Sequence, residues 1–249
     1  MTISKQALII AVADEKDSAN YLPGAEKDIH NYENFLISDA GGRWYYKTEV
    51  KSLLNPTKSQ VLKAISEVND DYSFIAYSGH GYISSHNGKT YMEFKDGELS
   101  ESDLITKSKK QTLLLDTCRK IVRKDFVQSI KKAMDESAET VYGARDIFDK
   151  HISRCEEGII KIYSTSPNQS AGEDLSGGYF TSSIISAGKE WNDTNGKNLE
   201  SNVLDLKHAF ENAVIIMKMK FDTTQVPQIN GGRRYGWFPF AVRNVIING

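Results

Sequence analysis

The chain has 249 residues, of which 39% are hydrophobic and 26% are charged, as in ordinary folded globular proteins. This composition excludes collagen-like, low-complexity and wholly disordered classes. Its 31 basic and 33 acidic side chains give a formal net charge of -2, so no overall positive field favours nucleic acid or an anionic membrane. We expect one domain over residues 1–249 in which local groups recognise any charged ligand.

Cysteine usage and apolar runs indicate the compartment. Cys118 and Cys155 are too few for a disulfide framework or a zinc site of four thiolates, which favours a reducing compartment. The first apolar run, residues 7–13, is short and ends in charged residues without a cleavage site. No other run approaches the roughly 20 apolar residues that cross a bilayer. The sequence therefore predicts a cytoplasmic protein with no membrane or nucleic-acid partner.

Short apolar runs bounded by polar or turn residues predict buried strands at residues 7–13, 74–77, 112–115 and 158–163. Segments with helical periodicity lie between them. One follows Pro23 and Gly24, and another begins at Thr57, where Thr57 and Gln60 form a capping-box pattern. The first half of the chain therefore alternates strand and helix.

The second half continues this alternation. Asp125 is placed to cap a third helix that extends to Met134, and residues 203–220 predict a longer one. Residues 84–110 and 138–157 lack clear periodicity, and we expect loops there. Alternating strands and helices predict a doubly wound α/β sandwich whose functional side chains gather at the carboxyl ends of the strands.

The first candidate catalytic side chain is His80. The strand predicted at residues 74–77 runs directly into Ser78-Gly79-His80-Gly81, which places an imidazole at the carboxyl end of a buried strand. Flanking glycines let the backbone turn tightly and approach a ligand closely. A single loop histidine is more often structural or merely exposed, so a partner is needed to assign chemistry to it.

That partner is Cys118, since the strand at residues 112–115 runs into Asp116-Thr117-Cys118-Arg119. Successive strands of a parallel sheet usually lie close together, so one imidazole nitrogen of His80 can reach the thiol, as a nucleophilic cysteine requires. A free cysteine is commonly buried and inert. The polar neighbours Asp116 and Arg119 argue against that alternative.

Other sites are mostly excluded. A tyrosine-phosphatase loop needs arginine where this chain has Lys124, and Cys155 lies away from any predicted strand end. The remaining histidines have no metal-binding spacing, and their structural alternative is favoured; they are His30, His86, His151 and His208.

Together, residues 77–81 and 115–119 resemble the catalytic dyad motifs of the caspase-like cysteine peptidases, which include caspases, metacaspases and bacterial relatives. Residues 7–12, 22–28, 164–173 and 178–181 resemble further segments of that family in the same order. The resemblance extends from about residue 5 to 243. It departs from true caspases because Cys118 lacks their flanking glutamine and glycine, and Asp116 is closer to the metacaspase type.

The resemblance implies a three-layer sandwich with a mainly parallel central sheet flanked by helices. It divides the chain into a large-subunit-like part (about 1–137), a processed linker (138–157) and a small-subunit-like part (about 158–249). Cys118 would be the nucleophile and His80 the general acid and base. The backbone N–H groups of Gly81 and Cys118 would form the oxyanion hole.

Substrate preference follows from two acids that match pocket positions of metacaspase-like members. Asp28 and Asp116 would form an acidic pocket that selects Arg or Lys before the cut, although a solvated carboxylate or an acid at the start of a helix is an equal alternative for Asp28. The sequence requires no cofactor. Calcium activation is implied because some metacaspases need it, yet the acids form no EF-hand pattern.

We therefore expect a cysteine endopeptidase that acts on proteins or peptides and cuts itself within residues 119–124 or 145–154. The resemblance also implies a stress or defence role with an activating protein partner, and the oligomeric state is left open. Two alternatives remain: a caspase-fold interaction protein with a latent or inactive site, and a thiol hydrolase that cleaves small esters rather than peptides.

Overall fold

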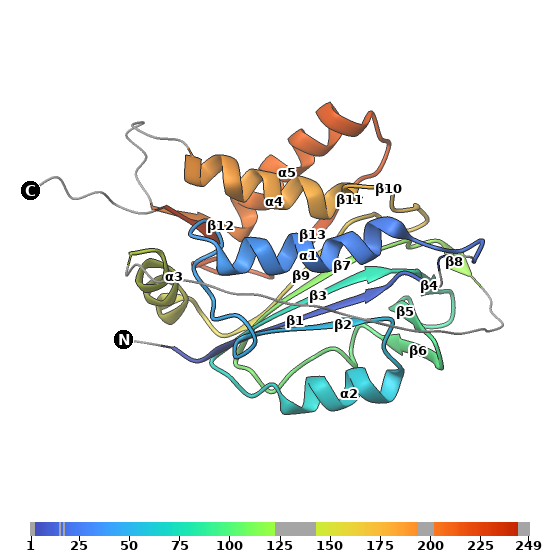
Figure 1. The fold of residues 1–249 in the computed structure, drawn as a ribbon, viewed down its shortest axis with the longest axis horizontal. Coiled ribbons are helices and arrows are strands. Elements are labelled where there is room, and N and C mark those ends of the chain that lie inside the picture. The colour runs from blue at the N-terminus through green and yellow to red at the C-terminus, as the bar shows by residue number, and fades with distance from the viewer. Residues whose placement is uncertain (1–2, 15, 17, 123–142, 194–201, 244–249) are drawn as a thin grey trace, which may run out of the picture.

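The computed structural model describes residues 3–243 except 15, 17, 123–142 and 194–201. Its centre is a six-stranded sheet in the order β13-β9-β7-β3-β1-β2 (Figure 1), parallel except for the edge strand β13. The strands are β1 (Lys5–Val12), β2 (Val50–Leu54), β3 (Tyr72–Gly79), β7 (Lys110–Thr117), β9 (Gly158–Tyr163) and β13 (Gln228–Asn230). All four strands predicted from apolar runs are confirmed.

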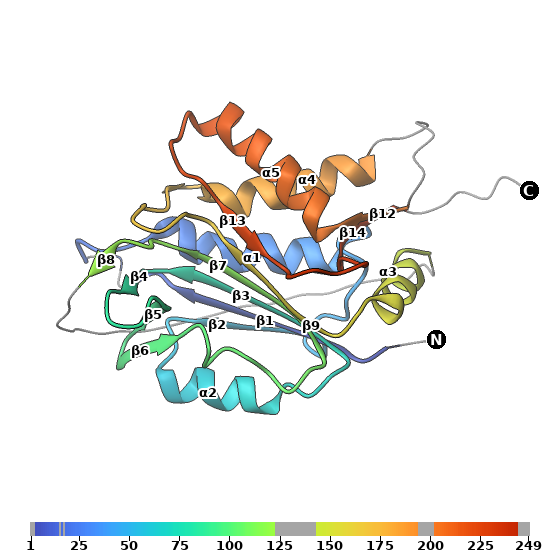
Figure 2. The same cartoon turned by 180° about the vertical axis from the view of Figure 1, so that it is seen from behind.

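Helices cover both faces of this sheet (Figures 1 and 2), which confirms the predicted three-layer α/β sandwich. On one face lie α1 (Pro23–Ile37), α3 (Gly143–Arg154), α4 (Tyr179–Asp193) and α5 (Leu206–Phe221), and on the other lies α2 (Lys58–Glu67). The two faces have separate cores because side chains alternate along each strand. Ile9 of β1 packs toward α1, whereas its neighbour Ile10 packs toward α2.

A second sheet, in the order β6-β5-β4-β8, lies on the α2 side, where Met92 and Phe94 join the core of Ile10. Its strands are β4 (Gly81–Ser84), β5 (Thr90–Phe94), β6 (Gly97–Ser100) and β8 (Ile121–Val122). Two short antiparallel pairs complete the described chain: β10 (Glu173–Asp174) with β11 (Gly177–Gly178), and β12 (Val203–Asp205) with β14 (Pro239–Val242).

Local sequence signals explain where the helices begin. The predicted capping box is present: Thr57 Oγ1 accepts from Gln60 N at 3.3 Å, and Thr57 N donates to Gln60 Oε1 at 2.8 Å. The helix predicted over residues 203–220 begins only at Leu206. Asp205 caps it by accepting a hydrogen bond from His208 N at 3.0 Å, which leaves residues 203–205 extended in β12.

The two expected loops were partly wrong. Residues 84–110 contain the antiparallel strands β5 and β6, and residues 143–154 form helix α3. Ala144, Phe148 and Ile152 repeat every four residues and are buried in the α1-side core, so packing stabilises a helix in this polar segment. The helix predicted from Asp125 lies outside the described residues.

Within the described ranges, no helix has the length and apolar character needed to cross a bilayer.

Candidate active site

The structure brings His80 and Cys118 to the same edge of the central sheet. Strands β3 and β7 are adjacent and parallel, and their last matched pairs are Ser78 with Asp116 and Gly79 with Thr117. His80 directly follows β3, and Cys118 directly follows β7. Both line one cavity of about 80 Å³. The spacing of the two strand-end motifs therefore translates directly into proximity of imidazole and thiol.

Hydrogen bonding determines which imidazole nitrogen can accept a proton. His80 Nε2 lies 2.8 Å from the carbonyl oxygen of Asn20, and a carbonyl oxygen can only accept. Nε2 must therefore carry the hydrogen, which leaves Nδ1 as the basic nitrogen. The hydroxyl of buried Tyr77 donates to the carbonyl oxygen of His80 at 2.7 Å and fixes the turn. The sequence left the choice of nitrogen open.

The residue after Cys118 anchors the thiol-bearing loop. Arg119 N donates to the Gln169 carbonyl at 2.8 Å, and Asn168 N donates to the Arg119 carbonyl at 2.8 Å. The buried guanidinium lies over the ring of Tyr163, 4.0 Å from its centroid. It also donates to Thr90 Oγ1, to the Thr165 carbonyl and to Gln228 Oε1. Arg119 thus ties Cys118 to β5, β9 and β13.

The second cysteine lies in a different environment. Cys155 is buried, and its sulfur lies 3.3 Å from the backbone carbonyl oxygens of both His151 and Trp237, between which its single thiol hydrogen is shared. Burial raises the pKa of the Cys155 thiol to about 11. Cys118, by contrast, is partly exposed and lines the cavity. Because the thiolate is the nucleophile, Cys155 is unsuited to catalysis.

Asp28 and Asp116, the predicted pocket acids, are both buried. Asp28 on α1 accepts hydrogen bonds from Ser78 Oγ at 2.6 Å and from Gly178 N at 3.1 and 3.2 Å. Asp116 accepts from the nitrogen and hydroxyl of Thr181 at 3.1 and 2.7 Å. These donors balance part of the desolvation of both carboxylates, and they make a solvated role for Asp28 untenable.

Burial raises the pKa of both carboxyl groups, and the negative charge of Asp116 raises the pKa of Asp28 further. Gly178 lies against both acids: a Cβ there would come 2.4 Å from Asp116 Oδ2 and 3.0 Å from Asp28 Oδ2. Two carboxyl groups so placed in a dry site resist being ionised together unless a cation lies beside them.

Sequence reasoning missed Glu173 as a pocket residue, although it lies in a segment that carries the family resemblance. Its carboxylate lines the same cavity and accepts a hydrogen bond from Ala25 N, at the start of α1, at 3.2 Å. Half-burial raises its pKa, and the charge of Asp116 adds to that effect. Among the described residues that line the cavity, none is Lys or Arg. The cavity is therefore acidic.

Of the two predicted oxyanion-hole residues, Cys118 lines the cavity, and Gly81 follows the cavity-lining His80 without lining the cavity itself. Gly81 opens β4 in close contact with Thr117 and Tyr91, where a Cβ would come 2.4 Å from Thr117 Oγ1. The donor role of the Gly81 and Cys118 N–H groups stays a prediction.

In the parts of the chain that the structure describes, no three His, Cys, Asp or Glu side chains are placed to hold a metal ion.

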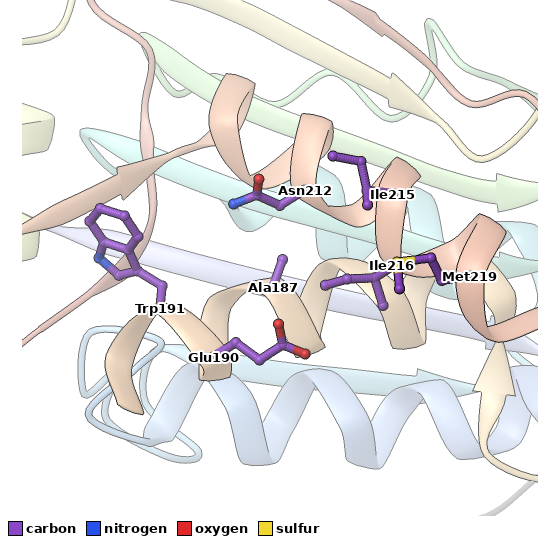
Figure 3. Close-up of a pocket in the computed structure, with 7 residues that line it drawn as sticks. All are labelled: Ala187, Glu190, Trp191, Asn212, Ile215, Ile216 and Met219. Carbon is purple, nitrogen blue, oxygen red and sulfur yellow. The ribbon is translucent and has the colours of Figure 1, made fainter. Parts of the chain in front are cut away.

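A larger hollow lies elsewhere, between α4 and α5 (Figure 3). It has a volume of about 390 Å³ and is lined mainly by apolar side chains, namely Ala187, Trp191, Ile215, Ile216 and Met219, with Glu190 and Asn212. None of the dyad or pocket acids lines it. The candidate chemistry is therefore confined to the smaller acidic cavity at the strand ends.

Comparisons with known proteins agree with this arrangement. The family model of the caspase domain matches residues 4–234. Among solved structures, caspase-1 from Spodoptera frugiperda is similar, with a TM-score of 0.58 and 14% sequence identity over 91% of this chain and 85% of that chain. At that identity the match bears on the fold. Comparison with curated protein sequences gives no match.

Proposed function

Because the chain belongs to the caspase family of cysteine peptidases, we propose that it is an endopeptidase that uses Cys118 and His80 and cuts after Arg or Lys. The observation that carries this proposal is the shared cavity, which holds the thiol, the imidazole and the carboxylates of Asp116 and Glu173. A peptidase domain acts on proteins or peptides. The dyad supplies the chemistry, and the acids supply the preference for a cationic side chain.

The mechanism follows from the protonation of His80. Nδ1 takes the proton of the Cys118 thiol, and the thiolate attacks the carbonyl carbon of the peptide bond. Backbone N–H groups of Gly81 and Cys118 would stabilise the oxyanion, where loss of one such donor typically costs about 3 kcal/mol. His80 then gives its proton to the departing amine as the C–N bond breaks. Water, deprotonated by His80, hydrolyses the thioester and restores the thiol.

The acidic cavity supports selection of Arg or Lys. A guanidinium that enters would meet Asp116, which lines the cavity, whereas buried Asp28 does not line it and would add its charge from behind Asp116. Burial otherwise disfavours the ionised forms of both acids and raises the pKa of each. Glu173 adds a third carboxylate at the rim. An aspartate side chain in the same place would add another unpaired negative charge, so acidic substrates are rejected.

Short peptides with Arg, Lys, Asp or uncharged citrulline before a reporter amide test this function. We expect wild type to cleave Arg and Lys reporters, Cys118→Ala to be inactive, and Asp116→Asn to lose the preference for Arg over citrulline. Equal cleavage of Asp and Arg reporters would contradict the pocket assignment but not the peptidase. Absence of any Cys118-dependent cleavage, with and without calcium, would contradict the peptidase.

One observation favours a latent form as the second candidate. The cavity of about 80 Å³ is smaller than the about 300–1,000 Å³ of ordinary ligand pockets, so an Arg side chain needs the pocket to widen. Widening by a protein partner agrees with the expected stress or defence role. An interaction protein whose cavity never opens is the alternative, and it predicts no cleavage even with a bound partner.

Calcium activation stays a prediction, which a calcium titration after EGTA dialysis tests.

A further inference from the structure

An acidic side chain outside the predicted site approaches the catalytic imidazole. Asp14 Oδ2 lies 3.8 Å from His80 Nε2, the nitrogen that donates to the Asn20 carbonyl. Both side chains are only partly exposed, at 31% for His80 and 25% for Asp14. The N–H of Nε2 therefore faces a neutral oxygen at hydrogen-bond distance and a carboxylate just beyond it.

The backbone around Asp14 is fixed in a conformation that places this carboxylate. Asp14 has a φ of 60°, in the left-handed region that Asp and Asn tolerate better than most residues. The side chain of buried Asn55, just after β2, accepts from Ala13 N at 2.7 Å and donates to the Asp14 carbonyl at 3.3 Å. Asn55 N in turn donates to the Ala11 carbonyl at 2.7 Å. The turn that follows β1 is thus clamped to the neighbouring strand.

We propose that Asp14 is a positioning residue that stabilises the charged imidazolium of His80 and so favours the thiolate of Cys118. The proposal rests on the catalytic roles proposed for His80 and Cys118. When Nδ1 takes the thiol proton, the positive charge spreads over the whole ring, and a carboxylate beside Nε2 lowers its energy. The Asn20 carbonyl fixes the orientation of the ring, whereas Asp14 contributes the charge.

Other titratable groups around His80 have different placements. In the described part of the chain, Asp116, Cys118 and Glu173 line the cavity with His80, and the hydroxyl of Tyr77 donates to the His80 carbonyl. Asp116 is held by Thr181, and Glu173 by the start of α1. Asp14 lies in the turn after β1, and its carboxylate forms an ion pair with Nε2 of the His80 ring.

The test measures alkylation of Cys118 by iodoacetamide as a function of pH, with peptide mapping to separate it from Cys155. Only the thiolate reacts, so the rate reports the thiolate fraction without any need for peptide cleavage. Asp14→Asn is the informative variant because asparagine keeps the size and tolerates the left-handed backbone. Glu67→Gln, an exposed residue of α2, is the matched loss of one negative charge.

We expect Asp14→Asn to be alkylated about tenfold more slowly than wild type at neutral pH, because it lacks the charge that favours the imidazolium and the thiolate together. At alkaline pH, where every thiol is ionised, the two proteins should react equally fast. Glu67→Gln should follow wild type throughout. Identical curves for wild type and Asp14→Asn would overturn the proposal, and so would an equal reduction at every pH, which indicates a merely structural role. Inactivity of wild type on all peptide reporters, with the alkylation difference intact, would overturn the peptidase function alone.

Discussion

The backbone nitrogen of Gly178 donates to both carboxylate oxygens of Asp28, at 3.1 and 3.2 Å. This contact joins the β10–β11 hairpin of the second half of the chain to α1 of the first half. Asp28 and Gly178 are 150 positions apart, so the acidic pocket exists only when the two halves pack together. The absence of a side chain at Gly178 leaves room for the buried acids.

Gly178→Ala should therefore disturb the acidic pocket, and with it substrate binding, more than it disturbs His80 and Cys118. The added Cβ would come 2.4 Å from Asp116 Oδ2, which forces the acid pair or the hairpin to move. We expect kcat/KM for Arg reporters to fall about 100-fold, the usual cost of a misplacement near 1 Å. Steady-state kinetics measure it, with Ser176→Ala in the same hairpin as control. Retention of the wild-type KM would contradict this account of the pocket.

The preference for Arg should be lost as the pH falls. Because the pocket acids have raised pKa values, this loss should begin at a higher pH than it would with ordinary exposed carboxylates. Burial raises the pKa of Asp28 and Asp116, so lowering the pH protonates the pair early and removes the charge that attracts Arg. The ratio of kcat/KM for Arg and citrulline reporters across pH isolates this effect, because dyad titration affects both equally. A pH-independent ratio would show that these acids do not contact the substrate.

Replacement of Arg119 should lower the free energy of unfolding. Arg119→Lys keeps a charge but loses the planar stacking on Tyr163 and the two hydrogen bonds from Nη1 to the Thr165 carbonyl and to Gln228 Oε1. Unpaired buried acceptors cost about 1–3 kcal/mol each, so we expect the free energy of unfolding to fall by about 2–4 kcal/mol. Urea unfolding measures this loss. Lys120→Arg, an exposed neighbour, is the control, and equal stability of Arg119→Lys and wild type would refute the anchoring role.

The ion pair between Lys5 and Asp149 should affect the free energy of unfolding strongly because both side chains are buried. The two side chains are 0% and 3% exposed, with the Lys5 ammonium between the rings of Trp44 and Phe148. Burial lowers the pKa of Lys5 and raises that of Asp149. Lys5→Met should cost about 3–5 kcal/mol of unfolding free energy because it leaves Asp149 in the core without its lysine partner.

Combining Lys5→Met with Asp149→Leu should recover most of that stability, since an apolar pair needs no desolvation of charge. A double-mutant cycle by chemical denaturation checks this. Additive losses in the double variant would show that the charges act independently of each other.

Self-cleavage within residues 145–154, which the sequence analysis predicts, should not occur in the folded protein. A peptidase binds its substrate in extended form, whereas these residues form α3, whose Phe148 and Ile152 are buried. Arg119 is likewise buried at its stack on Tyr163. Mass spectrometry of active protein after long incubation should find no new ends at Arg145, Arg154 or Arg119. Such ends, absent in Cys118→Ala, would show that these segments unfold.

Much of the fold and the core of the candidate site could be predicted because their signals are local. The strand at residues 74–77 and the strand at 112–115 each end in a chemically distinctive side chain, and parallel pairing brings these ends together. The helix misassigned at residues 203–205 and the loop misassigned at 143–154 show where local periodicity fails. At 203–205 the local cap Asp205 sets where the helix begins, and at 143–154 burial of Ala144, Phe148 and Ile152 against the rest of the core stabilises the helix.

The sequence by itself determined the class of chemistry, because a strand-end histidine and a strand-end cysteine leave a residue-type signature. Only the tertiary structure decided which imidazole nitrogen is basic, because a backbone carbonyl such as that of Asn20 looks the same in every sequence. It also placed Glu173 and Asp14, acids distant from both motifs along the chain, beside the candidate dyad: Glu173 lines its cavity, and Asp14 Oδ2 lies 3.8 Å from His80 Nε2. Their charges act through distance in space, which sequence position does not encode.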